Sequence, residues 1–71
     1  MEEFIKRMQE LLNTQEKITM STDLIDIEEW DSLSYVAFLA MVDSEYGKQI
    51  KGTKVKSAFT IGDLYNLIQE Q

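Results

Sequence analysis

The segment from residue 32 to residue 47 repeats apolar side chains at the spacing of an α-helix. Its sequence, SLSYVAFLAMVDSEYG, follows the i, i+3, i+4, i+7 and i+11 pattern of a helix face that packs on a core. A glycine at residue 47 suits the left-handed position that often ends a helix. The pattern therefore predicts a core helix over residues 32–47 whose inward face consists of Tyr35, Phe38, Leu39, Val42 and Tyr46.

Three other segments are expected to be helical and to pack against this one. Residues 2–13 begin with two glutamates, which favour a helix start, and residues 53–58 predict a short helix. The capping pattern over residues 60–63 predicts where the last helix begins. The fold class is therefore all-α, a small four-helix bundle with three main helices, a short third helix and a long loop between helices 1 and 2. The inward faces comprise Phe4, Ile5, Met8, Leu11 and Leu12 in the first helix, and Ile61, Leu64, Tyr65, Leu67 and Ile68 in the last.

The long loop, residues 14–30, lacks a helical period and is expected to be irregular. Three apolar residues, Leu24, Ile25 and Ile27, are expected to hold it against the core. Trp30 is expected to pack as a lid over them, because aromatic side chains mostly serve packing. A chain of 71 residues has room for one small domain, which is expected to span residues 1–71.

The sequence contains no Cys and no His, which removes most of the side chains that perform chemistry at neutral pH. There is then no thiolate nucleophile, no zinc site of the usual kind and no histidine base. The net charge of −6 disfavours nucleic acid and anionic membranes, and no apolar run is long enough for a membrane span. We therefore expect a non-catalytic, cytoplasmic protein whose partners are other proteins.

The acidic residues are concentrated in one part of the chain. Between residues 18 and 47 there are seven acids and no base, and five of these acids lie in the loop before Ser32. Such a segment creates a negative field that steers a basic partner toward it. The alternative of a calcium loop lacks the residue register of an EF-hand. The seven acids are Asp23, Asp26, Glu28, Glu29, Asp31, Asp43 and Glu45.

Ser32 lies in the tripeptide Asp31-Ser32-Leu33, between the acidic loop and the predicted core helix. A hydroxyl at a helix start has free backbone N–H groups and the positive end of the helix dipole beside it, so an attached phosphate is well tolerated there. The alternative is that Ser32 is an ordinary N-cap residue, although Asp31 could take that role instead.

A second apolar row on the same helix consists of Leu33, Val36, Ala37 and Ala40. A protein this small cannot bury both rows of the helix equally well. This second row could help to close the core, or it could face a partner protein. Docking is the favoured interpretation for Leu33, and both interpretations stay open for Val36.

Taken together, these residues resemble an acyl carrier protein. The resemblance rests on Asp31-Ser32-Leu33 at a helix start, the acidic loop before it, and the helix order long, long, short, long. The spacing from the serine to Ile50, and to Thr60-Ile61 at the last helix, also fits that family. The run from Asp23 to Leu33 is similar to carrier proteins that have Trp just before the Asp-Ser-Leu motif. The resemblance covers essentially the whole chain.

The resemblance implies that a phosphopantetheinyl transferase attaches the 4'-phosphopantetheine of coenzyme A to Ser32, with Asp31 and Leu33 beside the attachment point. Acyl groups would then be carried as thioesters on the borrowed thiol, and any Mg²⁺ would belong to the transferase. Acyl-loading and acyl-processing enzymes with basic surfaces are the implied partners of a monomer. A minority interpretation has Trp30 touching the arm. The implied docking residues are Asp26, Glu28, Glu29, Val36, Ala37, Ala40 and Asp43.

The chain departs from the familiar fatty-acid carriers in its charges. Ser34 and Ala37 stand where acids are common, and residues 48–56 carry four lysines where those carriers are acidic. These departures favour a specialised lipid or secondary-metabolite pathway over ordinary fatty-acid synthesis. Two alternatives remain, an aminoacyl or peptidyl carrier, and a helical interaction module without a prosthetic group.

Overall fold

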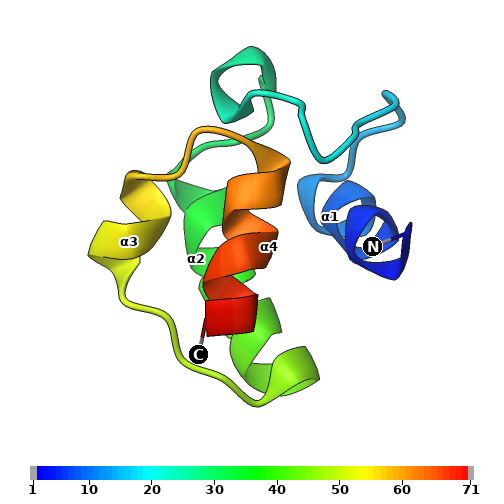
Figure 1. The fold of residues 1–71 in the computed structure, drawn as a ribbon. Helices are drawn as coiled ribbons and strands as arrows, with labels where there is room; N and C mark the ends of the chain where they lie inside the picture. The colour runs from blue at the N-terminus through cyan, green and yellow to red at the C-terminus, as the bar shows by residue number, and fades with distance from the viewer. Residues whose placement is uncertain (1, 71) are drawn as a thin grey trace.

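The core helix predicted from the sequence is present as α2 (Ser32–Met41). A computed structural model describes residues 2–70, and in it α2 packs with three further α-helices (Figure 1). These are α1 (Glu2–Leu12), α3 (Gly52–Lys56) and α4 (Ile61–Glu70). Two short turns complete the helical structure, the 3₁₀ turn η1 (Leu24–Asp26) and the π-helical turn η2 (Val42–Tyr46). The predicted all-α four-helix bundle is thereby confirmed, and residues 2–70 contain no β-strand.

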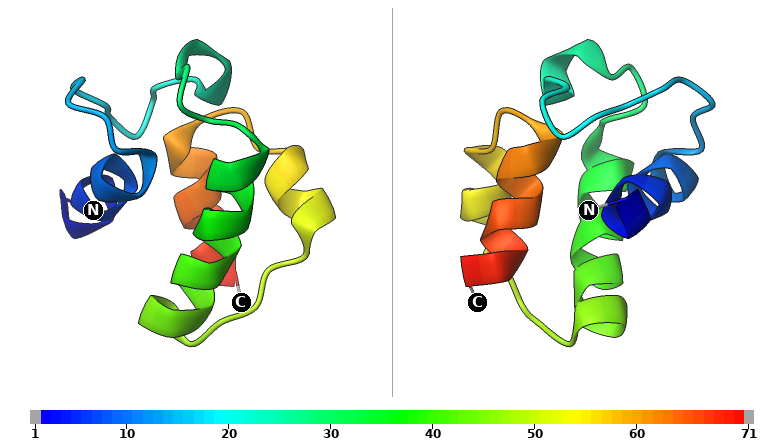
Figure 2. Two further views of the ribbon diagram at one scale, coloured as in Figure 1. Left: turned by 180° about the vertical axis from the view of Figure 1, so that it is seen from behind. Right: turned by 45° about the vertical axis from the view of Figure 1, so that its right-hand side comes forward.

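The arrangement of the helices brings the start of α2 to one end of the bundle. Helices α2 and α4 run side by side and start at the same end, and the long loop with η1 passes over that end (Figures 1 and 2). Helix α1 crosses them steeply, and it is seen almost end-on in Figure 1. Helix α3 lies on the other side of the bundle from α1. Ser32 therefore lies where the loop meets the bundle.

One apolar cluster forms the core, and every helix contributes to it. Of the predicted inward faces, one part is fully buried and the rest is half-buried against that cluster. The half-buried residues are Ile5, Leu11, Tyr35, Leu39, Tyr46, Tyr65 and Leu67. The buried core consists of Phe4, Met8, Leu12, Ile18, Leu24, Ile27, Phe38, Val42, Ile50, Val55, Ile61, Leu64 and Ile68.

Two helix ends differ from their predicted positions. The first helix ends at Leu12, one residue early, because Asn13 takes a left-handed conformation with φ 54°. Regular α-helix in α2 stops at Met41, and residues 42–46 continue as the wider π turn η2. Gly47 then ends the helix with φ 64°, the role predicted for it.

The third helix begins one residue before its predicted start and ends two residues before its predicted end. It begins at Gly52, where a Cβ atom would collide with the Oη atom of Tyr35. Glycine thus lets the start of α3 approach α2 closely. At the other end, the Ser57 hydroxyl donates a 2.8 Å hydrogen bond to the carbonyl of Lys54 and closes the last turn.

The prediction that Ile25 anchors the loop is wrong, since 91% of its surface is exposed. The tight η1 turn directs Leu24 and Ile27 into the core and leaves the intervening Ile25 outside. By contrast, the capping pattern of the last helix is confirmed. The Thr60 hydroxyl accepts from the N–H of Asp63 at 3.1 Å, and the Asp63 carboxylate accepts from the N–H of Thr60 at 3.1 Å.

Candidate functional site

The loop before Ser32 is held in place by the start of α4. The N–H of Gly62 donates to the carbonyl of Met20 at 2.7 Å, and the N–H of Ile61 donates to the carbonyl of Thr22 at 3.0 Å. A third bond runs the other way, from the N–H of Leu24 to the carbonyl of Phe59, at 2.8 Å. These three bonds, here called the loop clamp, fix residues 20–24, where the acidic part of the loop begins.

Trp30 anchors the loop a second time, just before α2. Its ring meets the buried ring of Phe38 edge-on, with centroids 6.3 Å apart and an interplanar angle of 72°. The backbone N–H of Trp30 donates to the carbonyl of Ile27 at 3.1 Å. The ring is half-buried, as expected for a lid, but it packs on the core helix as well as on the loop.

Asp31 is the N-cap of α2, so the alternative in which Ser32 caps this helix is wrong. The Asp31 carboxylate accepts a 2.9 Å hydrogen bond from the N–H of Ser34. The N–H and hydroxyl of Ser34, in that order of importance, lower the pKa of Asp31 because they stabilise the charged carboxylate. This negative charge takes one of the N–H groups that were expected to be available to a phosphate on Ser32.

Ser32 is the first residue of α2, and its side chain is exposed. Within residues 2–70 its hydroxyl makes no hydrogen bond, and the carboxylate of the neighbouring Asp31 is engaged in capping the helix. Leu33 follows with 82% of its surface exposed. The arrangement presents an unpaired hydroxyl and an apolar side chain together at the tip of the bundle, where another protein can reach both.

The second apolar row of α2 faces solvent. Val36 is 59% exposed, and Ala37 and Ala40 in the same row are exposed as well. The two alanines also line a groove of about 560 Å³ between α1 and α2, together with Leu11 and Met41. This row does not close the core, which leaves a shallow apolar surface running down the helix from Ser32.

Most of the predicted acidic docking residues lie on the surface. Asp26, Glu28 and Asp43 are exposed, whereas Glu29 is half-buried and its backbone carbonyl accepts from Ser34. Their carboxylates form no ion pair within the part of the chain that the structure describes. The negative field of the loop is therefore not neutralised internally.

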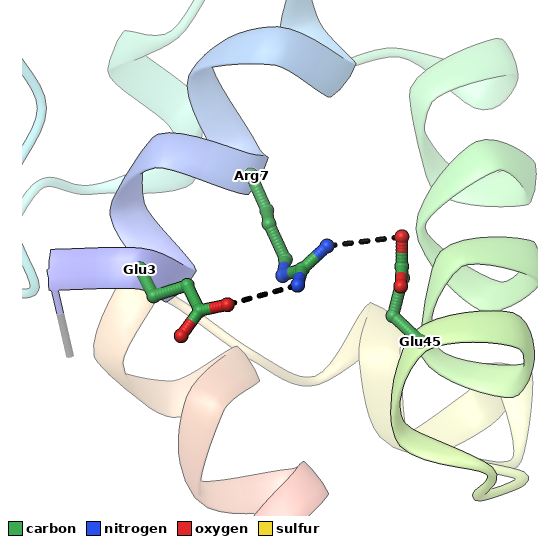
Figure 3. A network of polar contacts seen from close by, with 3 residues as sticks. All are labelled: Glu3, Arg7 and Glu45. Carbon is green, nitrogen blue, oxygen red and sulfur yellow. Dashed lines mark hydrogen bonds and ion pairs between the residues drawn. The ribbon is translucent and has the colours of Figure 1, made fainter.

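The ion pairs of the described residues both belong to Arg7 (Figure 3). Its guanidinium contacts Glu3 one turn earlier in α1 and Glu45 in η2, each at 2.9 Å. The hydrogen bond to Glu3, with the charge of Glu45 adding to it, raises the pKa of Arg7. The pairing ties α1 to η2, at the far end of α2, and takes Glu45 out of the free acidic surface.

A basic surface lies beside α2 on its other flank. Lys51, Lys54 and Lys56 are exposed on and just before α3, and the Lys56 ammonium lies 5.6 Å from the ring centre of Tyr35. Lys48 instead donates to the carbonyl of Ile68 near the end of α4 at 3.1 Å. Tyr35 is about one helical turn after Ser32, so the positive surface begins close to the candidate site.

Two features around the site were not predicted from the sequence. Ser34 is buried, and its hydrogen bonds to Glu29 and Asp31 link the loop to the helix. Phe59 is 77% exposed and shares a surface hollow with Ile25, which makes a second apolar patch on the loop clamp. A helical period over residues 32–47 does place Ser34 off the outer row, but the bond to Glu29 is not readable from spacing.

Neither a metal cluster nor a membrane helix is found between residues 2 and 70. No three His, Cys, Asp or Glu side chains are placed to hold a metal ion together. No helix there is long and apolar enough to cross a membrane. Comparison with protein-family models gives no match, and neither curated proteins nor solved structures provide one.

Proposed function

We propose that the protein is an acyl carrier that holds acyl intermediates as thioesters on a 4'-phosphopantetheine arm attached to Ser32. The observation that carries this proposal is the exposed Ser32 hydroxyl, which has no hydrogen-bond partner among residues 2–70 and lies at the first position of α2, directly after the N-cap Asp31. The serine follows an acidic loop that the loop clamp and Trp30 hold against the bundle.

The surroundings of Ser32 suit an attached phosphodiester in space and, in part, in charge. Its exposed side chain leaves room for the arm, and the N-terminal end of α2 favours a negative group. The negative charge of the Asp31 carboxylate repels a phosphate on Ser32. The enzyme that attaches the arm must therefore compensate for this repulsion. The arm supplies the thiol that the chain lacks, since the sequence contains no Cys.

Attachment would be the work of a phosphopantetheinyl transferase. The Ser32 oxygen forms a bond to the β-phosphorus of coenzyme A, the bond to the α-phosphate oxygen breaks, and adenosine 3',5'-bisphosphate leaves. The hydroxyl proton passes to a base of the transferase, because the side chains beside Ser32 offer none but the capping carboxylate. The carrier itself is not a catalyst in this scheme.

Partner enzymes would dock on the acidic loop and the exposed row of α2. Asp26, Glu28 and Asp43 lack ion-pair partners within residues 2–70, so basic groups on an enzyme can pair with them. Leu33 and Val36 supply apolar surface next to the arm. We place the carrier in the cytoplasm as a monomer, in a specialised lipid or secondary-metabolite pathway, because the lysines around α3 depart from the familiar fatty-acid carriers. An aminoacyl or peptidyl carrier is the related alternative.

The proposal is tested by intact mass spectrometry after incubation with coenzyme A and a broad-specificity phosphopantetheinyl transferase. We expect the mass to rise by one phosphopantetheine in the natural chain and in Ser21→Ala, which removes another exposed hydroxyl. Ser32→Ala should gain nothing. An unchanged mass with several such transferases would overturn the proposal and favour a helical interaction module that uses Leu33 and Val36.

The cargo is distinguished by loading assays on the modified protein. Acyl-activating and aminoacyl-activating enzymes are offered in parallel, and the thioester is read by mass. Transfer of an amino acid alone would replace the acyl carrier by an aminoacyl carrier and leave the attachment at Ser32 intact.

A further inference from the structure

Ser34 is a buried polar residue two positions after the candidate attachment serine. Only 8% of its surface is exposed, and it makes contacts in two directions. Its N–H donates to the Asp31 carboxylate at 2.9 Å, which is the ordinary cap of the helix. Its hydroxyl donates to the backbone carbonyl of Glu29 and also lies 3.1 Å from the same Asp31 oxygen.

The hydroxyl adds something that the helix cap alone does not provide. A serine hydroxyl has one proton, and here two acceptors on the incoming loop share it. The first turn of α2 is thereby tied to Glu29 and Asp31, on either side of Trp30. Ser32 lies between Asp31 and Ser34, and its side chain has no hydrogen bond of its own within residues 2–70. The backbone that carries the Ser32 side chain is therefore held on both sides, at Asp31 and at Ser34.

We propose that Ser34 is a positioning residue, whose hydroxyl fixes the junction between the loop and α2 so that Ser32 is held ready for modification. This inference rests on the proposed function, because its effect on rate requires that Ser32 is the attachment site. Ser34 would act on the chemical step and not on docking, since the exposed acids, Leu33 and Val36 stay in place without it.

The test compares three variants as substrates of the transferase with coenzyme A. Ser34→Ala removes the hydroxyl but keeps the backbone cap, and Ser34→Thr retains the hydroxyl. Ser57→Ala is the matched control, because it deletes another hydroxyl that bonds a backbone carbonyl, at the end of α3. We expect Ser34→Ala to lower kcat by roughly tenfold to a hundredfold with KM nearly unchanged, since small misplacement of a reacting group costs this much. Ser34→Thr should recover kcat, and Ser57→Ala should match the natural chain.

Amide hydrogen exchange provides a readout that does not depend on modification. We expect Ser34→Ala to speed exchange at Trp30 and Tyr35, whose N–H groups bond within the junction, while the buried part of α4 stays protected. A natural kcat in Ser34→Ala, a rise in KM alone, or an equal loss in Ser57→Ala would overturn the inference. So would exchange at Trp30 and Tyr35 that matches the natural chain.

The two proposals fail in different ways. If the natural chain gains no mass with any transferase, the carrier function fails, and the exchange experiment alone decides whether Ser34 fixes the junction. If the natural chain is modified and Ser34→Ala is modified equally fast, the carrier function stands and the role of Ser34 is refuted. If Ser34→Ala does not fold, the test is the kcat measured with Ser34→Thr, which retains the hydroxyl. A kcat far below that of the natural chain would then contradict the role of the hydroxyl.

Discussion

The backbone N–H of Gly62 donates a 2.7 Å hydrogen bond to the carbonyl oxygen of Met20, and this bond joins the start of α4 to the loop that leads to Ser32. A Cβ atom on Gly62 would lie only 2.8 Å from that oxygen. Because the obstacle is backbone and not a mobile side-chain end, the loop could make room only by moving as a whole. Glycine at this position is therefore a requirement of the loop clamp.

Gly62→Ala is expected to lower the free energy of unfolding by about 1–3 kcal/mol, the usual cost of forcing an atom into a packed site. Urea unfolding followed by circular dichroism measures it. The matched control is Gly47→Asn, since Gly47 has φ 64° with nothing within 4 Å of where a Cβ atom would stand, and Asn tolerates that conformation. Equal losses in the two variants would mean that the contact with Met20 is not what matters.

Two valines after Ser32, one in α2 and one in η2, should respond in opposite ways to truncation. Val42 is fully buried, so Val42→Ala is expected to cost about 2 kcal/mol of unfolding free energy. Val36 is exposed, so Val36→Ala should stay within about 0.5 kcal/mol. If Val36 serves docking, Val36→Ala should raise the KM of partner enzymes while its melting curve stays natural. A large loss of stability in Val36→Ala would show that it belongs to the core.

The charge of Asp31 should make the helix start sensitive to acid. Because hydrogen bonds from Ser34 lower its pKa in the folded state, its stabilising contribution is fully present above the pKa of the unfolded chain. That contribution is lost as the pH falls through the lower, folded pKa. Carboxyl-detected NMR titration should find the pKa of Asp31 below its ordinary value in the natural chain and closer to it in Ser34→Ala. If Asp31 titrates with the same midpoint in the natural chain and in Ser34→Ala, the Ser34 hydroxyl does not contribute to lowering its pKa.

Moderate salt should raise the melting temperature. The acids of the loop have no ion-pair partners within residues 2–70, so their mutual repulsion is screened as ionic strength increases. Salt also screens the attraction of Arg7 for Glu3 and Glu45, so these two ion pairs stabilise the fold less as the ionic strength increases. Arg7→Gln should therefore show a steeper rise with salt than the natural chain. A flat or falling dependence in both proteins would contradict net repulsion.

The helices were predictable because their signals are local. Apolar spacing located α1 to within one residue and predicted the helical run that α2 and η2 form together, and the Thr60–Asp63 cap formed at the predicted start of α4. The left-handed Gly47 is a similar case, since glycine readily adopts the left-handed conformation that ends many helices. Each of these features depends on residues within one or two turns.

The site was less predictable, because its geometry depends on contacts between distant residues. Spacing identified Ser32 and Asp31, but not the loop clamp, in which residues 20–24 meet residues 59–62. The exposure of Ile25 follows from the tight turn at η1, and the burial of Ser34 accompanies its hydrogen bonds to Glu29 and Asp31 in the incoming loop. The π turn at residues 42–46 likewise has no signature in the apolar pattern, which is continuous through it.

The loop clamp also sets an order of events during folding. Helices can form from nearby residues within microseconds. The backbone pairing of Asp23 with Thr60, an isolated antiparallel β-bridge at the loop clamp, must wait until the chain between these two residues has closed into a loop. The acidic loop is thus expected to be among the last parts to settle and, by the reverse path, among the first to open locally. A partner that binds this loop would therefore bind a segment that is ordered by its contacts with the start of α4. Substitutions that destabilise α4 should also disorder the chain next to Ser32.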